Sequence, residues 1–516
     1  MRGIRGAVAF VAVALVATAC SSSGSSTRKD VPTTKAARAP GADAIPPEVR
    51  DHAADWPLPG HDYANSRHAT DSPIDVGTIA RLASAWTATL SAGASTAPLV
   101  VGDTVYVEDG SGSVSALDRA TGAPRWHYAS HDYNIGPYGV AVANGTLFAT
   151  TPKGIVALDA TTGAKRWTRD LNRTRTEGVD IDPTVFDGMV LVSTVPISIQ
   201  GQFAAGDRGT IHALDARTGA DVWSFDTVES KDLWGHPDVN SGGGAWYAPA
   251  VDTARGVVYF GTGNPAPFPG TKAFPNGSSR PGADLYSDSI LALGTSDGAL
   301  HWYFQPYPHD LFDRDFVHTM LVDVKRGATT QTVVVGTGKG GEVLGFDRDT
   351  GKLLWRTKVG EHDNDQLTSL TGPTAILPGT YGGVETPPAS ADGVVYVATL
   401  NAPTTLSPDK PSYIGSEFGT KDGEMVAVDA ATGRVLWDSK VPGDPFGAAT
   451  VVNGLVLTTT YNGMVVAYDR HSGRIVWQYQ LPGKVNGWMT IAGDLLLVPV
   501  GIANPPQLVA LRLPAG

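Results

Sequence analysis

Six residues of this chain have the side chains expected of a site that holds a small molecule together with a metal ion. They are three carboxylates, an amide, a lysine and a tryptophan, namely Asp180, Asp313, Glu385, Asn264, Lys339 and Trp246. Carboxylate and amide oxygens are the ligands that hard cations prefer. A few polar groups that converge on a hollow are typical of a small-molecule site. The six residues therefore predict such a site, provided that the fold brings them together.

The pattern that must position these residues is a repeated phrase that ends near a tryptophan. Seven copies contain a turn before the tryptophan, as in DRATGAPRW and DAATGRVLW. These copies end at Trp126, Trp167, Trp223, Trp302, Trp355, Trp437 and Trp477, and an eighth, Trp86 in LASAWTATL, lacks the turn. A period of about 40 residues built from short strands and glycine turns is typical of β-propeller blades.

Each phrase predicts a four-stranded antiparallel blade. An apolar strand such as SVSALD runs into Asp-x-x-Thr-Gly, where the aspartate accepts hydrogen bonds from the turn and the glycine adopts a positive φ. The next strand places its tryptophan where neighbouring blades bury it. Alternating apolar residues upstream, as in DTVYV and GLVLTTT, supply the two inner strands. A generic all-β sandwich is the alternative, but sandwiches lack such a regular repeat.

The two ends of the repeat array predict how the ring closes. The chain finishes with QLVALRLPAG, a third strand without the turn and tryptophan of a fourth. The array begins with the Trp86 strand, which lacks its three predecessors. We therefore expect the strand around Trp86 to complete the last blade beside residues 508–513. The prediction is an all-β, eight-bladed β-propeller whose ring is closed by an N-terminal strand and has no free edge.

The first 51 residues have the pattern of an export signal and a tether. Two arginines precede an apolar run at 7–16, and small residues then lead to Cys20. This arrangement resembles a bacterial lipobox, so we expect residues 1–20 to be a lipoprotein signal peptide and Cys20 to be the lipid anchor. A plain signal peptide with an incidental cysteine is the alternative. Residues 21–51 are rich in Ser, Thr, Ala and Pro, which is typical of a flexible tether.

Composition narrows the partners and the location. The net charge is −12 and no basic patch with interleaved aromatic residues occurs, which disfavours nucleic acid as a partner. One repeat array covers the rest of the chain, so residues 52–516 are predicted to form a single propeller domain. Cys20 is the only cysteine, which excludes an internal disulfide and a Cys-x-x-Cys-His haem attachment. The expected location is the cell envelope, with the lipid on the outer side of a bacterial cytoplasmic membrane.

Long insertions indicate which face of the ring carries function. Nearly all of the extra residues between tryptophans fall in loops that leave the face opposite the Asp-x-x-Thr-Gly turns. These loops are 194–209, 224–245, 263–285, 303–316, 356–385 and 400–423. The six residues named above stand at this face, either where innermost strands start or in loops between second and third strands. Long insertions on one face of a rigid ring usually build a binding site, with decoration by solvent-exposed loops as the alternative.

Three segments give the chain a resemblance to the quinoprotein alcohol dehydrogenases, which use pyrroloquinoline quinone (PQQ) on an eight-bladed propeller. They are GGGAWYAP at 242–249, GTGNPAPF at 261–268 and PHDLFDRDF at 308–316. DWPLPGHDYANSRHA around Trp56 is also similar to the opening segment of that family. The resemblance extends from there to the last blade. The tryptophan phrase alone says little about chemistry, because non-catalytic propellers share it.

The resemblance implies a cofactor site for PQQ. Trp246 would be the aromatic floor on which the flat quinone stacks, and Gly244, within a run of three glycines, would let the backbone approach it. Lys339 would contact the quinone oxygens, and Asp180 is assigned to the same site. The alternatives are ordinary structural roles, namely a core tryptophan and a surface lysine.

The resemblance also implies a cation site for calcium or a lanthanide. Asn264 would give its amide oxygen to the cation. Asp313 would be both the general base and a neighbour of the metal. Asp315 matches the extra carboxylate of the family's lanthanide-using members. The alternatives are a turn residue at Asn264 and a solvated pair of loop aspartates.

The function expected from the resemblance is a PQQ- and metal-dependent dehydrogenase of an extracytoplasmic alcohol or polyol. Asp313 would take the alcohol proton while hydride passes to the quinone, and a separate cytochrome or quinone carrier would accept the electrons. Two departures leave other functions open. The segment 196–209 lacks the family's metal-binding glutamate, for which Gln202 or Asp180 could substitute, and the family's vicinal disulfide is impossible here. The alternatives are a non-catalytic lipoprotein propeller that acts as a scaffold in outer-membrane barrel assembly, and a former enzyme that binds a ligand.

Overall fold

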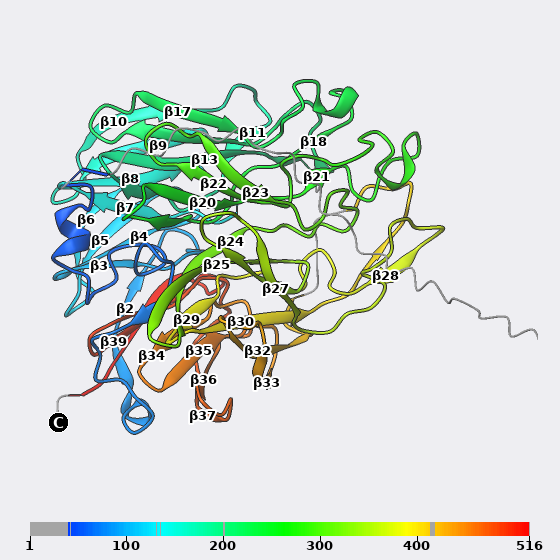
Figure 1. Ribbon diagram of the computed structural model, residues 1–516. Helices are drawn as coiled ribbons and strands as arrows, with labels where there is room; N and C mark the ends of the chain where they lie inside the picture. The colour runs from blue at the N-terminus through cyan, green and yellow to red at the C-terminus, as the bar shows by residue number, and fades with distance from the viewer. Residues whose placement is uncertain are drawn as a thin grey trace, which may run out of the picture.

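The computed structural model describes residues 40–514 apart from 42, 131, 135, 200, 201 and 413–417. Eight sheets of four or five strands follow one another around a ring (Figure 1). The predicted all-β, eight-bladed β-propeller is therefore confirmed. The lipid-anchor prediction at Cys20 falls outside the described residues, as does the side chain of Gln202.

The first four blades take their strands in chain order, from the ring axis outward. Blade one contains β3 (Leu99–Val101), β4 (Thr104–Glu108), β5 (Val114–Asp118) and β6 (Pro124–Tyr128). Blade two contains β7 (Val140–Ala143), β8 (Thr146–Thr151), β9 (Gly154–Asp159) and β10 (Lys165–Asp170). Blade three contains β11 (Glu177–Val179), β12 (Thr184–Phe186), β13 (Met189–Pro196), β16 (Thr210–Asp215) and β17 (Asp221–Asp226). Blade four contains β19 (Ala250–Asp252), β20 (Val257–Gly261), β22 (Ile290–Gly294) and β23 (Leu300–Phe304).

The other four blades complete the ring. Blade five contains β24 (His318–Arg326), β25 (Thr329–Gly338), β26 (Glu342–Asp347) and β27 (Leu353–Lys358). Blade six contains β29 (Ala389–Ala391), β30 (Val394–Asn401), β32 (Asp422–Asp429) and β33 (Val435–Val441). Blade seven contains β34 (Thr450–Val452), β35 (Leu455–Thr459), β36 (Met464–Asp469) and β37 (Ile475–Gln480). Blade eight contains β38 (Thr490–Ala492), β39 (Leu495–Val500), β40 (Gln507–Arg512) and β2 (Ala83–Thr89).

The ring closes as the two ends of the repeat array predict. Strand β2 pairs antiparallel with β40, and Trp86 is opposite Ala510. The Nε1 of Trp86 then donates to the carbonyl of Arg119 in blade one (3.1 Å), so the closing strand also contacts the next blade.

Seven of the eight tryptophans dock their blade onto the turn of the next one, and Trp477 is the exception because blade eight has no such turn. Trp126 of blade one donates from Nε1 to the carbonyl of Ala160 in blade two (3.0 Å). Its ring packs on Gly163, where an added Cβ would lie 2.6 Å from the indole. Gly163 has a φ of 72°, and Oδ1 of Asp159 accepts from the N–H of Thr162 in the same turn (2.9 Å). The glycine is therefore required both for the turn conformation and for the space that the tryptophan fills.

The long loops and the N-terminal helix lie on opposite faces of the ring. The loops contain three small pairs of strands: β14 (Ser198–Ile199) with β15 (Gln202–Phe203), β18 (Ser241–Gly242) with β21 (Pro265–Ala266), and β28 (Thr374–Ile376) with β31 (Thr404–Leu406). They also contain two short 3₁₀ turns, Leu233–Gly235 and Pro275–Gly277, and a third, Ile79–Arg81, precedes β2. In Figure 1, β18, β21 and β28 lie to the right, whereas the blue helix α1 (Pro47–Arg50) is on the left.

Helix α1 is held on the face that carries the short turns. The Glu48 carboxylate accepts from the N–H groups of Asn144 and Gly145, in the Asn-Gly turn between β7 and β8. Across residues 40–514, leaving aside the undescribed positions, no helix has the length and apolar character needed to cross a bilayer.

The N-terminal segment 57–69 crosses the ring axis, a feature that the repeat pattern did not predict. Its last part, β1 (His68–Ala69), pairs in parallel with β34 of blade seven. Tyr63 Oη donates to a carbonyl of blade three (2.6 Å), Asn65 Nδ2 to one of blade five (3.0 Å) and Arg67 Nη2 to one before blade eight (2.9 Å). The segment therefore links innermost strands from around the ring and closes the channel below the long loops.

Candidate functional site

Lys339, in the loop after β25, is the centre of a cluster that contains most of the predicted site. Its Nζ lies 3.1 Å from Asp313 Oδ2 and 2.6 Å from Asp315 Oδ2. It also lies 5.0 Å from the centroid of the Trp246 ring. Asn264 joins the cluster through its N–H, which donates to Asp315 Oδ1 (2.7 Å). We call these five residues the Lys339 cluster, and two neighbouring blades, four and five, supply all of them.

Glycines allow two loops of blade four to meet beside Trp246. Gly244 has a φ of 106°, and an added Cβ would lie 2.6 Å from Cγ1 of Val195. The N–H of Gly263 donates to the Gly244 carbonyl (2.9 Å), and a Cβ on Gly263 would lie 2.8 Å from Trp246 Nε1. Gly244 thus has a structural reason to be glycine. Its contact with a cofactor stays a prediction.

The two aspartates of the cluster lie on a strained loop. Asp313 and Asp315 have positive φ values of 65° and 24°, which non-glycine residues rarely adopt. The Asp310 carboxylate stabilises the loop by accepting from the N–H groups of Phe312 and Arg314, both at 2.9 Å. Strain that is held in place by such surrounding contacts is concentrated at functional sites.

Carboxylates outnumber cations around Lys339. Burial raises the pKa of Asp313 well above its ordinary value, Lys339 opposes this rise and Asp315 adds to it. Burial also raises the pKa of Asp180, and it raises the pKa of Glu385 to about 7, both against the charge of Lys339. Burial disfavours the Lys339 ammonium, but the neighbouring carboxylates outweigh it and raise the pKa of Lys339. One ammonium therefore stands among several acids, and a cation bound beside them would favour their ionised forms.

The polar atoms of the site fit a hard cation and a bound cofactor. Asp313 Oδ1, Asp180 Oδ1, Glu385 Oε2 and Trp246 Nε1 are buried and make no hydrogen bond within the described part of the chain. Buried polar groups without partners are uncommon, and oxygen donors are what calcium and lanthanide ions bind. Among the described residues, no three His, Cys, Asp or Glu side chains are already gathered in a metal-binding arrangement. The acids are instead placed around the ammonium of Lys339.

Asp180 lies apart from the hydrogen-bonded cluster. It follows β11 in blade three, and its carboxylate packs against Gly136, which has a φ of 67°. The charges of Lys339 and Asp315 act on the Asp180 carboxyl, which places it near the same site without direct contact. Residues 180–183 interrupt the innermost strand, because β11 and β12 both pair with β13 and leave these residues unpaired.

Sequence reasoning missed three residues around the cluster. Asp288 is fully buried, and neither of its carboxylate oxygens makes a hydrogen bond within the described structure. Burial raises its pKa, and the charges of Asp310, Asp315 and Asp313 raise it further. The Tyr381 ring centroid lies 5.6 Å from Lys339 Nζ, and Tyr381 belongs to no recognisable sequence motif. Asp310, which braces the loop of Asp313, could have been found, since it lies within the same PHDLFDRDF segment.

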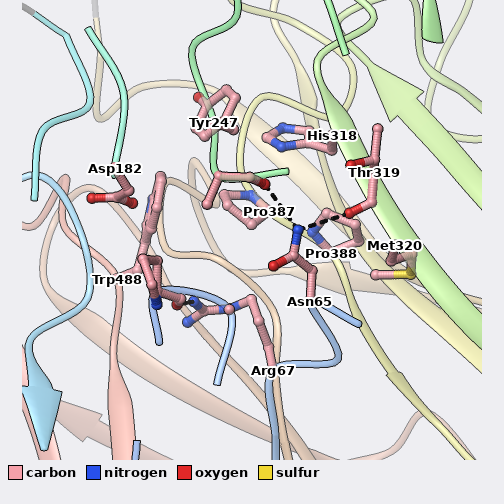
Figure 2. Close-up of a pocket in the computed structure, with 13 residues that line it drawn as sticks. Asn65, Arg67, Asp182, Tyr247, His318, Thr319, Met320, Pro387, Pro388 and Trp488 are labelled. Atoms are coloured by element: carbon pink, nitrogen blue, oxygen red, sulfur yellow. Dashed lines mark hydrogen bonds between the residues drawn. The ribbon is translucent and has the colours of Figure 1, made fainter. Parts of the chain in front are cut away.

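A small cavity lies between segment 57–69 and the blades, one residue along the chain from Trp246. Tyr247, the next residue, lines it together with Asn65, Arg67, Asp182, His318 and Trp488 (Figure 2). The cavity has a volume of about 30 Å³, enough for one or two water molecules. Asp182 Oδ2 and His318 Nε2 are buried without partners in the described structure, so polar atoms are available to such water.

The pH dependence of stability should report the buried state of Asp182. Burial raises its pKa to about 7, against the hydrogen bond from Thr96 and the charge of Arg67. The folded protein therefore keeps a proton that the unfolded chain loses above its ordinary pKa of 3.8, so the unfolding free energy falls as pH rises from about 4 to 7. We expect Asp182→Asn to flatten this slope in urea titrations. The exposed control Asp71→Asn should retain it, and an equal slope in both variants would refute the assignment.

Comparison with known proteins connects these residues to a family of enzymes. The family model described as the β-propeller domain of glucose, ethanol and alcohol dehydrogenases matches residues 56–141 and 174–368. A second model, described as the outer membrane protein assembly factor BamB, matches residues 421–511. The residues matched by the first model include the whole Lys339 cluster, and those matched by the second model include none of it.

Curated relatives and solved structures agree with the first model. A quinohemoprotein alcohol dehydrogenase of Comamonas testosteroni is 28% identical over 419 residues, which cover 70% of this chain and 57% of that protein. A lanthanide-dependent methanol dehydrogenase of Methylacidiphilum fumariolicum is 28% identical over 465 residues, 74% of this chain and 73% of that protein. The solved quinohemoprotein alcohol dehydrogenase ADHIIG of Pseudomonas putida superposes with a TM-score of 0.77 at 20% identity and covers 93% of this chain and 83% of that one, a likeness of fold.

Proposed function

Because this chain belongs to the PQQ-dependent alcohol dehydrogenase family, we propose that it is a PQQ- and metal-dependent dehydrogenase that oxidises an alcohol or polyol. The observation that carries the proposal is the Lys339 cluster, in which a tryptophan face, a lysine and two aspartates converge at one end of the channel. The activity itself remains a proposal, because the alignment spans only 57% of the length of the Comamonas relative.

When bound, PQQ would supply the acceptor for hydride from the alcohol carbon, and the cation would supply a Lewis acid beside the quinone. Asp313 would take the hydroxyl proton on Oδ1, the carboxylate oxygen that has no partner in the described structure. Asn264 and Asp315 would hold the cation through oxygen atoms, and Asp180 would stand in for the missing glutamate of blade three. The Lys339 ammonium would stabilise negative charge that develops on the quinone oxygens.

We also propose a cellular location for the protein, on the basis of the N-terminal sequence. The lipobox-like segment ending at Cys20 supports export and a lipid anchor on the outer side of the cytoplasmic membrane. Electrons would then leave to an external cytochrome or quinone carrier, since the sequence has no haem attachment motif.

The scaffold alternative is favoured only by the BamB match. That match covers residues 421–511, which contain blade seven, three of the four strands of blade eight and the last two strands of blade six. Every residue of the Lys339 cluster lies outside it, as do Asp180 and Glu385. A scaffold gives no reason for buried carboxylates with unsatisfied oxygens around a lysine, whereas a cofactor site does.

Reconstitution tests the proposed function. The purified protein would be mixed with PQQ and either calcium or a light lanthanide, and the quinone absorbance recorded. Alcohol-dependent reduction of a dye would then be measured with a panel of primary alcohols and polyols. Absence of quinone binding with either metal would reject the proposal. Quinone binding without dye reduction would favour the former enzyme that only binds a ligand.

Asp315→Asn is expected to separate the two kinds of metal. The change removes one negative charge but keeps an oxygen that can accept from the N–H of Asn264. A trivalent lanthanide loses more attraction than divalent calcium when a neighbouring charge is removed. The apparent affinity in reconstitution titrations should therefore fall further for the lanthanide. An equal fall for both metals would remove Asp315 from the cation site.

A further inference from the structure

The carboxylate oxygens of the Lys339 cluster are already largely occupied by donors of the protein. Asp315 Oδ1 accepts from the N–H of Asn264, and Asp315 Oδ2 lies 2.6 Å from Lys339 Nζ. Asp313 Oδ2 accepts from the same Nζ at 3.1 Å. Among these four oxygens, only Asp313 Oδ1 makes neither a hydrogen bond nor an ion pair within the described structure. A cation that uses both aspartates must therefore share or take an oxygen that Lys339 or the Asn264 N–H already occupies, and two of the three occupied oxygens pair with Lys339.

Lys339 cannot leave these oxygens for water at low cost. Its side chain is 7% exposed, and those of Asp313 and Asp315 are 4% and 0% exposed. A buried ammonium without an anionic partner is strongly unfavourable. The faces of Trp246 and Tyr381 lie 5.0 and 5.6 Å from Nζ, so the nearest place for a displaced ammonium is over the predicted quinone floor.

We propose that Lys339 is an internal counter-ion that competes with the metal for Asp313 and Asp315. Metal binding moves its ammonium from the two carboxylates toward the space over Trp246. An anionic quinone bound there supplies the partner that the displaced ammonium needs. The metal and the cofactor consequently bind cooperatively, with Lys339 as the residue that couples them. This inference rests on the proposed function and adds to it the order of events at the site.

Coupling of this kind is reciprocal. If PQQ strengthens metal binding because it accepts the ammonium, then the metal must strengthen PQQ binding by the same factor. The net charge of the site explains the sign, since Lys339 repels an incoming cation as long as it lies between the two aspartates.

The first test measures Tb³⁺ binding to the full-length protein without PQQ, by terbium luminescence excited through tryptophan. Lys339→Gln removes the competing ammonium and should tighten Tb³⁺ binding by about tenfold or more, within the range of typical site couplings. Lys339→Arg keeps the charge and should bind Tb³⁺ like the wild type. Lys358→Gln, at a half-exposed lysine paired with Asp365, is the matched control and should also leave the affinity unchanged.

The second test measures the coupling. Saturation with PQQ should tighten Tb³⁺ binding to the wild type by about fivefold or more, and Tb³⁺ should equally tighten PQQ binding followed by quinone absorbance. In Lys339→Gln this mutual effect should disappear. The double variant Lys339→Gln with Asp315→Asn should lose the gain in Tb³⁺ affinity, which assigns the gain to this site.

The outcomes separate the inference from the proposed function. Unchanged or weaker Tb³⁺ binding in Lys339→Gln, while the wild type binds both PQQ and metal, overturns the inference and leaves the function intact. A wild type that binds neither PQQ nor Tb³⁺ overturns the proposed function and the inference with it. Should Lys339→Gln not fold, as judged by thermal unfolding, the wild type still decides, because absence of PQQ–Tb³⁺ coupling would reject the inference.

Discussion

Replacing Asp313 with asparagine is expected to lower kcat/KM for alcohol oxidation by about 10²- to 10⁴-fold, the usual contribution of a general base. Asparagine has nearly the same shape but cannot accept the hydroxyl proton. The strained loop should persist, since its bracing comes from Asp310 and not from Asp313 itself. PQQ binding, followed by quinone absorbance at saturating metal, should therefore survive the substitution.

The pH profile distinguishes loss of the base from loss of the metal. The base acts as a carboxylate, so wild-type kcat/KM should rise with pH as Asp313 loses its proton, and burial raises the pKa of that group. The Asp313→Asn profile should lack this limb at every metal concentration. Asp238→Asn, at an exposed loop position on the same face, is the control and should keep the full rate. Full activity in Asp313→Asn would show that another group takes the proton.

Arg67→Met is expected to lower the free energy of unfolding by about 3 to 5 kcal/mol, because it leaves several buried acceptors without a donor. Arg67 is 1% exposed and lies between the rings of Trp56 and Trp488, 5.2 and 5.9 Å from their centroids. Its guanidinium donates to the carbonyls of Ala449, Met489 and Pro59 and to the hydroxyl of Thr450. Methionine fills much of the same volume but makes none of these hydrogen bonds.

Equilibrium urea unfolding measures this effect directly. Arg50→Met, at an arginine whose ion pair with Asp51 is more than half exposed, is the control and should leave the unfolding free energy unchanged. A midpoint for Arg67→Met equal to that of the control would show that the segment across the channel does not hold the blades together. A lower midpoint with loss of cooperativity would indicate that the ring opens before it unfolds.

The repeat phrase determined the architecture because its interactions are local and recur. The residues of each turn lie within five positions of one another, and seven of the eight tryptophans meet the turn of the next blade. Seven such phrases and one truncated copy were enough to predict eight blades, the pairing of β2 with β40 and the face that carries the long loops. The same reasoning placed Lys339, Asp313 and Trp246 at one end of the channel.

The sequence did not reveal how the side chains of the site pair with one another. Residues 57–69 contain no periodic pattern, yet Arg67 contacts residues more than 380 positions away. Asp288 lies just before β22, in a segment without a recognisable motif. It becomes a candidate site residue only because the fold buries it near Asp313. That Lys339 lies between two aspartates depends on distances of a few ångströms across two blades.

There is a physical reason why some features follow from the sequence and others only from the tertiary structure. Strand periodicity, turn chemistry and tryptophan docking are set by neighbours in the chain or by the adjacent repeat, so the sequence by itself determines the ring, its closure and its functional face. The pairing of buried charges, the segment across the channel and the competition at Lys339 depend on how eight twisted sheets bring distant residues together. Only the tertiary structure decides them, because the cost of burying each charge is fixed by which partner the fold places beside it.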